Sequence, residues 1–578
     1  MFRRPVSFLL IASLALASAA PARDAVYPVI ARHAMVVAPE PRAADVGLAV
    51  LARGGNAFDA AVAIGFLLAV THPLAGNLGG GGFAVGLPAD GPPFVLDFRE
   101  TAPGAAHRDL FLDERGDPVP GASTETRLAV GVPGTVDGLL RLLETYGSRP
   151  RADLIAPAIE AAWNGVTVGP LFETALASRQ DLLARSAATR AIFFRDGEPF
   201  RFGDVVVQED LARTLEAIAA LGRDGFYAGD VAGAIAADMR EHGGLITEAD
   251  LAGYRAVFRE PFRFVVDGNE FLTPPLPSSG GIVIAEILGL LGPDALDGVG
   301  WHSAEHVRRV VEAERLAFAD RSRGLGDPAF VDSPVAELLS AEYLAARREL
   351  LPAAGIARSA DVVPGDPRGA GEATVPPADP EGVPVLGETC HFCVVDALGN
   401  VVSVTTTLNS WFGCGAVVAG GGFFLNNEMD DFTTKPGASD QYGLVGSAAN
   451  EIAPGKRPLS SMTPTIVRKD GEFVLAMGAP GGSTIITTLL QIWQNLTTFD
   501  MNVREAVDAP RFHHQWWPDK IYAEPFALSS ETRGSLEHLG YVVEERTGLG
   551  RAMAITRTAD GRLAGWADRR STGRACGQ

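Results

Sequence analysis

The pattern of hydrophobic and polar positions divides the chain into two parts. Before residue 350, helical and strand patterns alternate. Two amphipathic helices are predicted within Ala43–Ala69, separated by Gly54-Gly55-Asn56, and strands are predicted at Phe83–Leu87 and Phe94–Phe98. Four further helices are predicted at Leu154–Trp163, Leu211–Leu221, Asp230–Glu241 and Ser303–Phe318. This alternation predicts layers of α-helices on β-sheets.

Residues 351–388 interrupt this pattern. The stretch contains seven prolines and no aromatic residue. Such a composition buries little apolar surface, so we expect an exposed, mobile segment. It ends at Gly387-Glu388-Thr389.

Beyond this break the pattern turns to β-structure. Phe392–Asp396 and Val401–Leu408 alternate and predict a hairpin. The remaining features are a Gly-rich stretch at Gly413–Gly422, a strand pair at 464–478, a helix at Thr484–Leu496 and β-structure at Tyr541–Trp566.

The N-terminus has the pattern of a secretory signal peptide. Arg3 and Arg4 precede the apolar run Val6–Leu16, which is followed by Ala17-Ser18-Ala19. The run is shorter than the roughly 20 residues that span a membrane. We therefore expect residues 1–19 to be removed and the protein to be periplasmic or secreted, with no membrane span left.

Charge and cysteine content narrow the possible partners. The 578 residues carry a net charge of −21, which disfavours nucleic acid as a partner. A chain of this length suits one large layered unit or two interlocked ones. The four cysteines allow a disulfide, but the sequence does not choose a pairing: Cys390, Cys393, Cys414 and Cys576.

Two short motifs offer other chemistry. The pattern H-x-x-E-H occurs at His302–His306, and on a helix both histidines would share a face, as zinc ligands do. The alternative is an ordinary amphipathic helix. Cys390-His391-Phe392-Cys393 matches C-x-x-C, but residues three apart on a strand point to opposite faces, which disfavours a redox pair.

The sequence lacks the glycine-rich and serine motifs of several familiar enzyme classes. The run Gly79–Gly82 lacks the lysine of a P-loop and the spacing of a dinucleotide-binding fingerprint, so close backbone packing is the better interpretation. There is no Gly-x-Ser-x-Gly elbow of a serine hydrolase.

Between Glu388 and Gly482, polar groups cluster in a region otherwise patterned for a core. Buried polar groups must be satisfied, so these groups are expected to line a site. The segments are Glu388–Asp396, Thr405–Asn409, Asn426–Phe432, Lys456–Met462 and Pro480–Ser483.

Together these segments resemble the γ-glutamyltransferase (glutathione hydrolase) family across nearly all of the mature chain. Further matching stretches are Asn77–Gly82, Leu96–Glu100, Pro274–Gly281, Ala319–Ser322 and Ala509–Trp516. The resemblance implies a four-layer αββα sandwich of the N-terminal-nucleophile hydrolase type. It also places His302–His306 in an ordinary helix, and it implies no metal and no cofactor.

The resemblance further implies that the precursor cuts itself between Glu388 and Thr389. The products would be a large subunit of residues 20–388 and a small catalytic subunit of residues 389–578, held as a heterodimer. A threonine hydroxyl needs a base, and the freed α-amine, with a pKa near 8, can serve as one.

The implied site binds a γ-glutamyl group, such as that of glutathione, and passes it to water or to an amine. Thr389 is the expected nucleophile and Thr407 its hydrogen-bond partner, on the strand face that Thr405 shares. Gly481 and Gly482 match the oxyanion hole, and Tyr442 matches the tip of a lid formed by 435–446. The expected substrate-binding residues are Arg99, Ser460 and Ser461 for the α-carboxylate, and Asp431 with its neighbours Asn409 and Glu428 for the α-amine.

Two residues depart from the family pattern, and two other functions remain as alternatives. Cys390 replaces a second threonine common after the nucleophile, and Thr484 replaces a basic residue after Pro-Gly-Gly-Ser. A β-lactam side-chain acylase is the alternative enzyme, although Arg99, Asp431 and the lid favour γ-glutamyl substrates. An unprocessed binding protein is the alternative outside enzymes.

Overall fold

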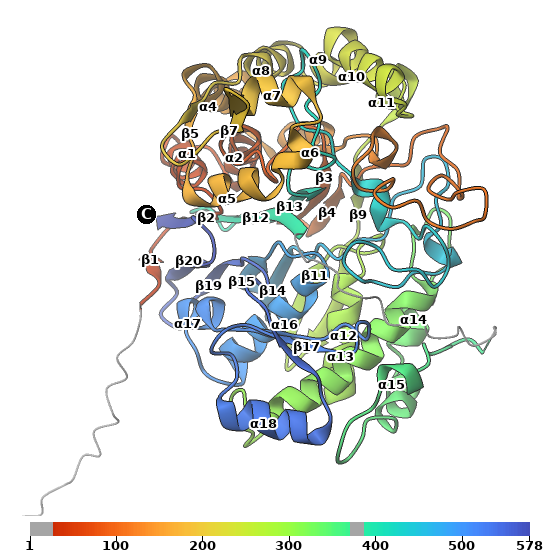
Figure 1. Cartoon of the computed structure of the whole chain (residues 1–578). Helices are drawn as coiled ribbons and strands as arrows, with labels where there is room; N and C mark the ends of the chain where they lie inside the picture. Colours follow the sequence, from red (N-terminus) through yellow and green to blue (C-terminus); the bar gives the residue numbers. More distant parts are fainter. Residues whose placement is uncertain (1–26, 370–386) are drawn as a thin grey trace, which may run out of the picture.

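Two seven-stranded antiparallel sheets, stacked face to face, form the centre of the molecule (Figure 1). The computed structural model describes residues 27–369 and 387–578. In spatial order the first sheet contains β21 (Arg574–Gly577), β2 (Met35–Ala38), β12 (Gly387–Val395), β13 (Val401–Ser410), β3 (Gly81–Leu87), β4 (Phe94–Asp97) and β9 (Val257–Arg259). The second contains β1 (Val29–Ala31), β20 (Leu563–Ala567), β19 (Met553–Arg557), β15 (Glu472–Gly478), β14 (Thr465–Lys469), β11 (Asn269–Thr273) and β10 (Phe262–Val266).

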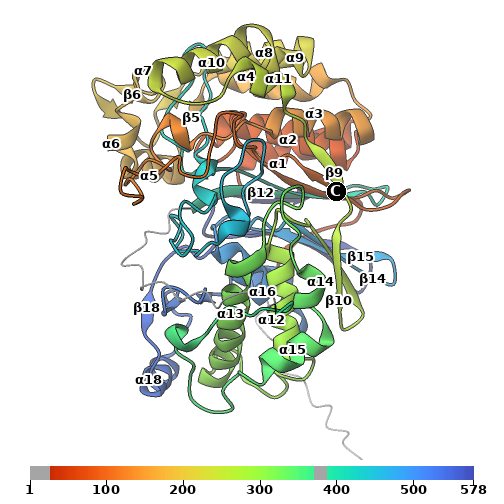
Figure 2. The same cartoon turned by 90° about the vertical axis from the view of Figure 1, so that its right-hand side faces the viewer.

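Helices cover the outer face of each sheet, which gives four layers (Figures 1 and 2). The layer on the first sheet includes α1 (Pro41–Ala52), α2 (Ala57–Thr71), α3 (Thr135–Tyr146), α4 (Arg151–Asn164), α8 (Glu209–Leu221) and α10 (Gly229–His242). The layer on the second includes α12 (Gly280–Leu291), α13 (Ala304–Gly324), α16 (Thr484–Thr497) and α17 (Val503–Asp508). The αββα sandwich expected from the sequence is therefore confirmed.

Smaller elements surround these layers. The helices are α5 (Pro170–Ser178), α6 (Gln180–Leu183), α7 (Ala187–Phe193), α9 (Asp224–Tyr227), α11 (Glu248–Gly253), α14 (Val335–Leu338), α15 (Ala341–Arg348) and α18 (Ser530–Leu539). The strands are β5 (Val166–Thr167), β6 (Phe194–Arg195), β7 (Glu198–Pro199), β8 (Val205–Val206), β16 (Phe512–His513), β17 (Ile521–Ala523) and β18 (Val543–Glu545).

Strand β12 shows how the two cores form. Its side chains alternate: Phe392 and Val394 pack under the helices of the first layer, whereas Val395 packs between the two sheets. Both faces are buried, so the strand is apolar at most positions instead of alternating with solvent-facing polar residues. Helix α2 lies in the same core and is buried along its whole length.

Both halves of the chain contribute strands to each sheet. In the first sheet β12 pairs with β2 on one side and with β13 on the other, and β13 pairs in turn with β3. In the second sheet β11 pairs with β14. The halves on either side of residue 388 are therefore interleaved and do not form separate domains.

The predicted helices and strands are present, and one expectation about the Pro-rich segment 351–388 is wrong in part. The helices around Gly54–Asn56, the hairpin at 392–408 and the helix from Thr484 are all present. The expectation of an exposed segment is wrong in part: within 351–369, Ser359 and Val362 are buried, whereas Arg358 and Val363 are exposed. Residues 370–386 and the predicted signal peptide lie outside the described residues.

Within the described ranges, no helix combines the length and apolar character needed to cross a membrane.

Candidate functional site

Thr389 lies on β12 directly opposite Thr407 of β13. Its Oγ1 donates a hydrogen bond to Oγ1 of Thr407 at 3.2 Å, and the latter oxygen also accepts from the backbone N–H of Asn409 at 2.8 Å. The regular strand pairing is interrupted between Gly387 and Thr389. The strand therefore becomes irregular at the bond predicted to be cut.

One pocket contains ten of the eleven residues predicted for the site. Its lining includes Thr389, Thr407, Arg99, Asn409, Glu428, Asp431, Tyr442, Ser460, Ser461 and Gly482. The eleventh, Gly481, immediately precedes Gly482. These residues come from β12 and β13, from the loop after β4, from the turn before α16 and from the long connection between β13 and β14.

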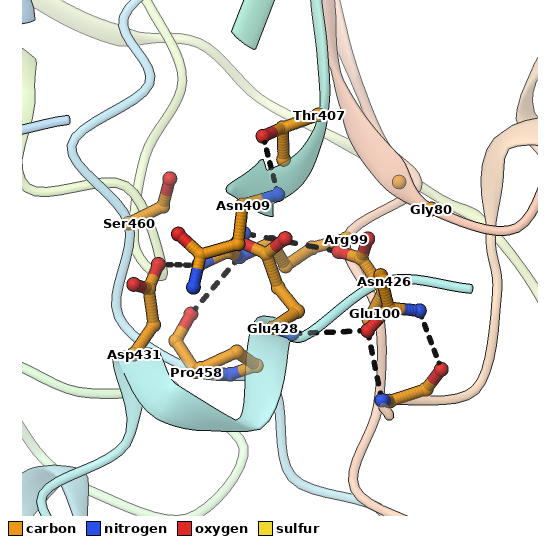
Figure 3. A network of polar contacts seen from close by, with 12 residues as sticks. Gly80, Arg99, Glu100, Thr407, Asn409, Asn426, Glu428, Asp431, Pro458 and Ser460 are labelled. Atoms are coloured by element: carbon orange, nitrogen blue, oxygen red, sulfur yellow. Dashed lines mark hydrogen bonds and ion pairs between the residues drawn. The ribbon is translucent and has the colours of Figure 1, made fainter. Parts of the chain in front are cut away.

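Arg99 makes more polar contacts than any other side chain in the pocket (Figure 3). It is fully buried. Its Nη1 and Nη2 contact the carboxylates of Glu428 and Asp431, and Glu100 lies 3.8 Å from Nη1. The guanidinium also donates to the carbonyl oxygens of Pro458, at 3.3 Å, and Leu459, at 3.4 Å. Arg99 thus holds the residues on both sides of the pocket together.

Burial changes the protonation of the surrounding acids. It raises the pKa of Glu100 to about 8 and that of Glu428 well above its usual value, although the charge of Arg99 opposes both shifts. Removal from water disfavours the charged form of a carboxyl group more strongly than one shared cation can offset. Near neutral pH the pocket is therefore less negative than its count of acids suggests.

Tyr442 lines the pocket from a loop between Thr433 and Glu451. Its hydroxyl donates to the backbone oxygen of Asn409 at 2.8 Å and lies 2.6 Å from the side-chain Oδ1 of that residue. Asp440 fixes the loop by accepting the backbone N–H groups of Tyr442 and Leu444, at 2.8 and 3.0 Å. The tyrosine is 6% exposed. The segment that the sequence predicted as a lid therefore lines the same pocket as Thr389.

The two serines sit on a platform made by the segment before α12. The backbone N–H of Ser460 donates to the oxygen of Pro277 at 2.7 Å, and the backbone oxygen of Ser460 accepts from Ser279 N at 2.8 Å. A Cβ on Gly280 would lie 1.6 Å from Oγ1 of Thr463, so only glycine allows this approach. The predicted match at Pro274–Gly281 therefore has a structural role beneath the pocket.

Gly481 and Gly482 form a tight turn at the N-terminus of α16. Their φ angles are +137° and +58°, which side-chain-bearing residues rarely adopt. Oγ1 of Thr484 donates to the oxygen of Gly481 at 2.9 Å. Thr484, one of the two departures from the family pattern, thus stabilises the turn expected to form an oxyanion hole.

Two charged pocket residues, Arg321 and Asp440, were not predicted for the site. Arg321 lies within Ala319–Ser322, a stretch that the sequence matched without assigning a role to it. Asp440 lies in the predicted lid, but its loop gives no periodic signal. Both reach the pocket through the packing of α13 and the lid against the sheets.

Some polar residues of the predicted cluster instead hold the chain around the pocket. Asn426 accepts from the backbone N–H groups of Gly131 and Glu428, at 2.9 and 3.0 Å, and donates to the oxygen of Gly79 at 2.7 Å (Figure 3). Nζ of Lys456 donates to backbone oxygens of its own loop. The expectation that the whole cluster lines a site is therefore too broad.

The contacts do not support either alternative motif. His302 precedes α13, and its Nδ1 lies 2.7 Å from the oxygen of Ala527, while Glu305 pairs with Arg308 and Arg309. No group of three or more metal-binding side chains occurs in residues 27–369 and 387–578. Cys390 and Cys393 belong to different cores, on opposite faces of β12, and no disulfide joins any of the four cysteines, all of which lie in the described residues.

Comparisons with known proteins agree with the geometry. A family model described as gamma-glutamyltranspeptidase matches residues 43–578. The chain is 47% identical over 515 residues to the glutathione hydrolase proenzyme of Pseudomonas sp. (strain A14), covering 89% of this chain and 87% of that protein. It is 43% identical to the protein of the same name from Escherichia coli (strain K12), covering 95% and 92%.

A solved structure shares the whole fold. The cephalosporin acylase from Bacillus halodurans superposes with a TM-score of 0.83 at 26% identity, covering 97% of this chain and 98% of that one.

Proposed function

Because this chain belongs to the gamma-glutamyltranspeptidase family and is an enzyme of that type, we propose that Thr389 is its nucleophile and that glutathione and related γ-glutamyl amides are its substrates. One observation carries the proposal. A single pocket holds the hydroxyl of Thr389 together with a cation, Arg99, and a carboxylate, Asp431. A γ-glutamyl group carries the matching pair of charges, an α-carboxylate and an α-ammonium group.

The first step is maturation of the precursor. Oγ1 of Thr389 attacks the carbonyl carbon of Glu388, and the acyl group moves from nitrogen to oxygen. Water opens the resulting ester, which leaves a carboxylate on Glu388 and a free α-amine on Thr389. The products are residues 20–388 and 389–578. The irregular pairing of β12 at this bond and the proenzyme names of the relatives support this step.

In the mature enzyme the free α-amine of Thr389 acts as the base. It accepts the hydroxyl proton while Oγ1 attacks the γ-carbonyl carbon of the substrate. The amine of the leaving group takes up a proton as the C–N bond breaks, and a γ-glutamyl ester of Thr389 remains. Water or an acceptor amine then attacks the ester and restores the hydroxyl.

The pocket orients the substrate by charge. Arg99, Ser460 and Ser461 are proposed to bind the α-carboxylate, since a guanidinium fork matches a planar carboxylate. Asp431, with Asn409 and Glu428, is proposed to bind the α-ammonium group. The N–H groups of Gly481 and Gly482 would receive the oxyanion, where loss of one donor costs about 3 kcal/mol of barrier.

Cephalosporin acylase activity is the second candidate, because a protein of that name shares the fold. A glutaryl side chain keeps a carboxylate but has no amine for Asp431. Tyr442 is buried and lines the same pocket as Thr389, which supports a covered site where water is limited and transfer to an amine is favoured. These features favour γ-glutamyl substrates. The signal-like residues 1–19 support action in the periplasm or outside the cell.

The test begins with the purified wild-type protein and its Thr389→Ala variant. Intact mass and N-terminal sequencing should give two wild-type fragments, the smaller beginning Thr389-Cys390-His391, and one uncut variant chain. The wild type should cleave γ-glutamyl p-nitroanilide in preference to glutaryl p-nitroanilide. A variant that matured and kept activity would remove Thr389 from both roles, and a preference for the glutaryl substrate would favour the acylase.

A further inference from the structure

Arg321 differs from the other buried arginine of the pocket in its partners. It lies on α13, is 6% exposed and lines the pocket beside Thr389 and Ser461. Arg99 has three carboxylates within 4 Å. Arg321 has none within that distance among the described residues. A buried charge is costly unless an opposite charge or several hydrogen bonds compensate it, so this guanidinium is suited to an anion that enters the pocket.

The contacts of Arg321 lead to the two serines of the pocket. Its Nε donates to Oγ of Ser279 at 2.9 Å, and Nη2 lies 3.5 Å from Oγ of Ser461. Oγ of Ser279 donates in turn to the backbone oxygen of Ser460 at 2.8 Å. The guanidinium is therefore linked to Ser460 through the hydroxyl of Ser279. It contacts Ser461 directly, at the upper limit of a hydrogen-bond distance.

The charge balance around Arg99 gives a second reason. Asp431, which contacts the guanidinium of Arg99, competes with any incoming carboxylate for it. Asp440 and Asp431 lie near enough to Arg321 to favour its charged form, although burial opposes it. A second cation next to the serines would supply positive charge that the Arg99–Asp431 pair lacks.

We propose that Arg321 is a positioning and specificity residue for the substrate's α-carboxylate. It fixes the Ser460–Ser461 turn through Ser279 and Ser461, and its positive charge is neutralised when the carboxylate binds at those hydroxyls. This inference rests on the proposed function, and it assigns the matched stretch Ala319–Ser322 a role in substrate binding.

Two anilide substrates separate this role from simple support of the fold. γ-Glutamyl p-nitroanilide carries the α-carboxylate, whereas 4-aminobutanoyl p-nitroanilide keeps the amine and lacks the carboxylate. In matured Arg321→Met, KM for the first should rise roughly 10- to 100-fold with a smaller change in kcat. The value of kcat/KM for the second should change less than about threefold.

Three further variants complete the test. Arg321→Lys keeps the charge and should recover part of the loss, and Ser279→Ala should give a smaller but equally selective rise in KM. Arg323→Met is the matched control, since this arginine lies on the same helix and pairs with Asp366 at 2.8 Å, outside the pocket lining. It should behave as the wild type. If Arg321→Met does not mature, the lysine variant provides the same comparison between substrates.

Equal losses on both substrates, or an unchanged KM for the γ-glutamyl anilide, would overturn the role of Arg321 in an otherwise active enzyme. A matured wild-type protein that cleaved neither anilide would instead overturn the proposed function, and this inference with it.

Discussion

Asp430 and Asp431 are neighbours in the chain, but their carboxylates have different surroundings. Asp431 contacts Arg99 and lines the pocket. Asp430 accepts from Oγ of Ser123 at 2.6 Å and from the backbone N–H of Gln441 at 3.1 Å, outside the pocket lining. A difference of one position therefore separates a carboxylate that can meet the substrate from one that holds the lid.

Replacing Asp431 by Asn should weaken binding of γ-glutamyl substrates. The change removes a charge-assisted hydrogen bond to the α-ammonium group, worth roughly 1.5–3 kcal/mol, and should raise KM about 10- to 100-fold. Steady-state kinetics with γ-glutamyl p-nitroanilide measures the effect. Asp430→Asn is the matched control and should change KM much less. Equal effects of the two variants would remove Asp431 from the amine site.

At the scale of elements, the turn before α16 joins the lid to the predicted oxyanion hole. A Cβ on Gly482 would lie 2.7 Å from Cδ1 of Tyr442, and one on Gly481 would lie 2.3 Å from Oγ1 of Thr484. Tyr442 and Thr484 therefore occupy the space that a side chain at either glycine would need. The backbone of the turn cannot move without displacing either the lid or the first residue of the helix.

We predict that Gly482→Ala lowers kcat/KM for the γ-glutamyl anilide roughly 100-fold, the cost of misplacing one oxyanion donor. The control is Gly471→Ala in the hairpin between β14 and β15, where φ is +86° and no atom lies within 4 Å of the added Cβ. Both variants carry the strain of a positive φ, but only the first meets Tyr442. Similar activity losses in the two would show that strain alone is responsible.

At the scale of the whole molecule, the predicted cut divides interleaved parts. β12, which would begin the small fragment, lies between β2 of the large fragment and β13 of the small one. β13 pairs with β3 over seven residue pairs. Separating the fragments would expose both sheets and their shared core.

The two fragments should therefore stay associated after maturation. We expect one peak in size-exclusion chromatography, with both fragments in it, and separation only in denaturant. The chromatography should be run on wild-type protein at high ionic strength. Salt weakens exposed ion pairs but not the burial of apolar surface, so fragments held by a shared core should stay together. Fragments that separated under native conditions would contradict the interleaved arrangement.

Buried titratable groups predict how stability depends on pH. Burial lowers the pKa of six histidines from 6.5 to about 3 or 4: His72, His302, His306, His391, His513 and His514. Below pH 6.5 the unfolded chain binds protons that the folded chain does not, so acid favours unfolding. Burial also raises the pKa of Glu100 to about 8 and of Asp430 to about 7.

These carboxyl groups act in the opposite direction. The folded chain retains their protons above pH 4.5, where the unfolded chain releases them, so stability should fall as the pH rises towards 8. Below pH 6.5 the six histidines outweigh these two carboxyl groups, and above it only the carboxyl groups titrate, so the melting temperature of the uncut Thr389→Ala chain should be highest at about pH 6.5. Asp430→Asn should flatten the alkaline side. A melting temperature that rose steadily from pH 6.5 to 8.5 would contradict this prediction.

The sequence by itself determined the elements and the chemical groups. Period-2 and helical patterns located β12, β13 and α16 because these signals depend on neighbouring residues. The order of the polar segments identified the family and, through it, predicted eleven site residues. Local pattern failed at Ser359: proline content predicts exposure, but the burial of this residue depends on partners far along the chain, since Asp519 accepts from its backbone N–H at 2.9 Å.

Only the tertiary structure decided how these groups meet. Arg99 and Glu428 are 329 positions apart and touch because Asn426 ties the segment before Glu428 to Gly79 and Gly131. Arg321 reaches the pocket from a helix of the outer layer, which no local pattern indicates. Long-range packing also separates Asp431 from Asp430 and Cys390 from Cys393, because the face that a side chain presents depends on the layers that cover its strand or loop.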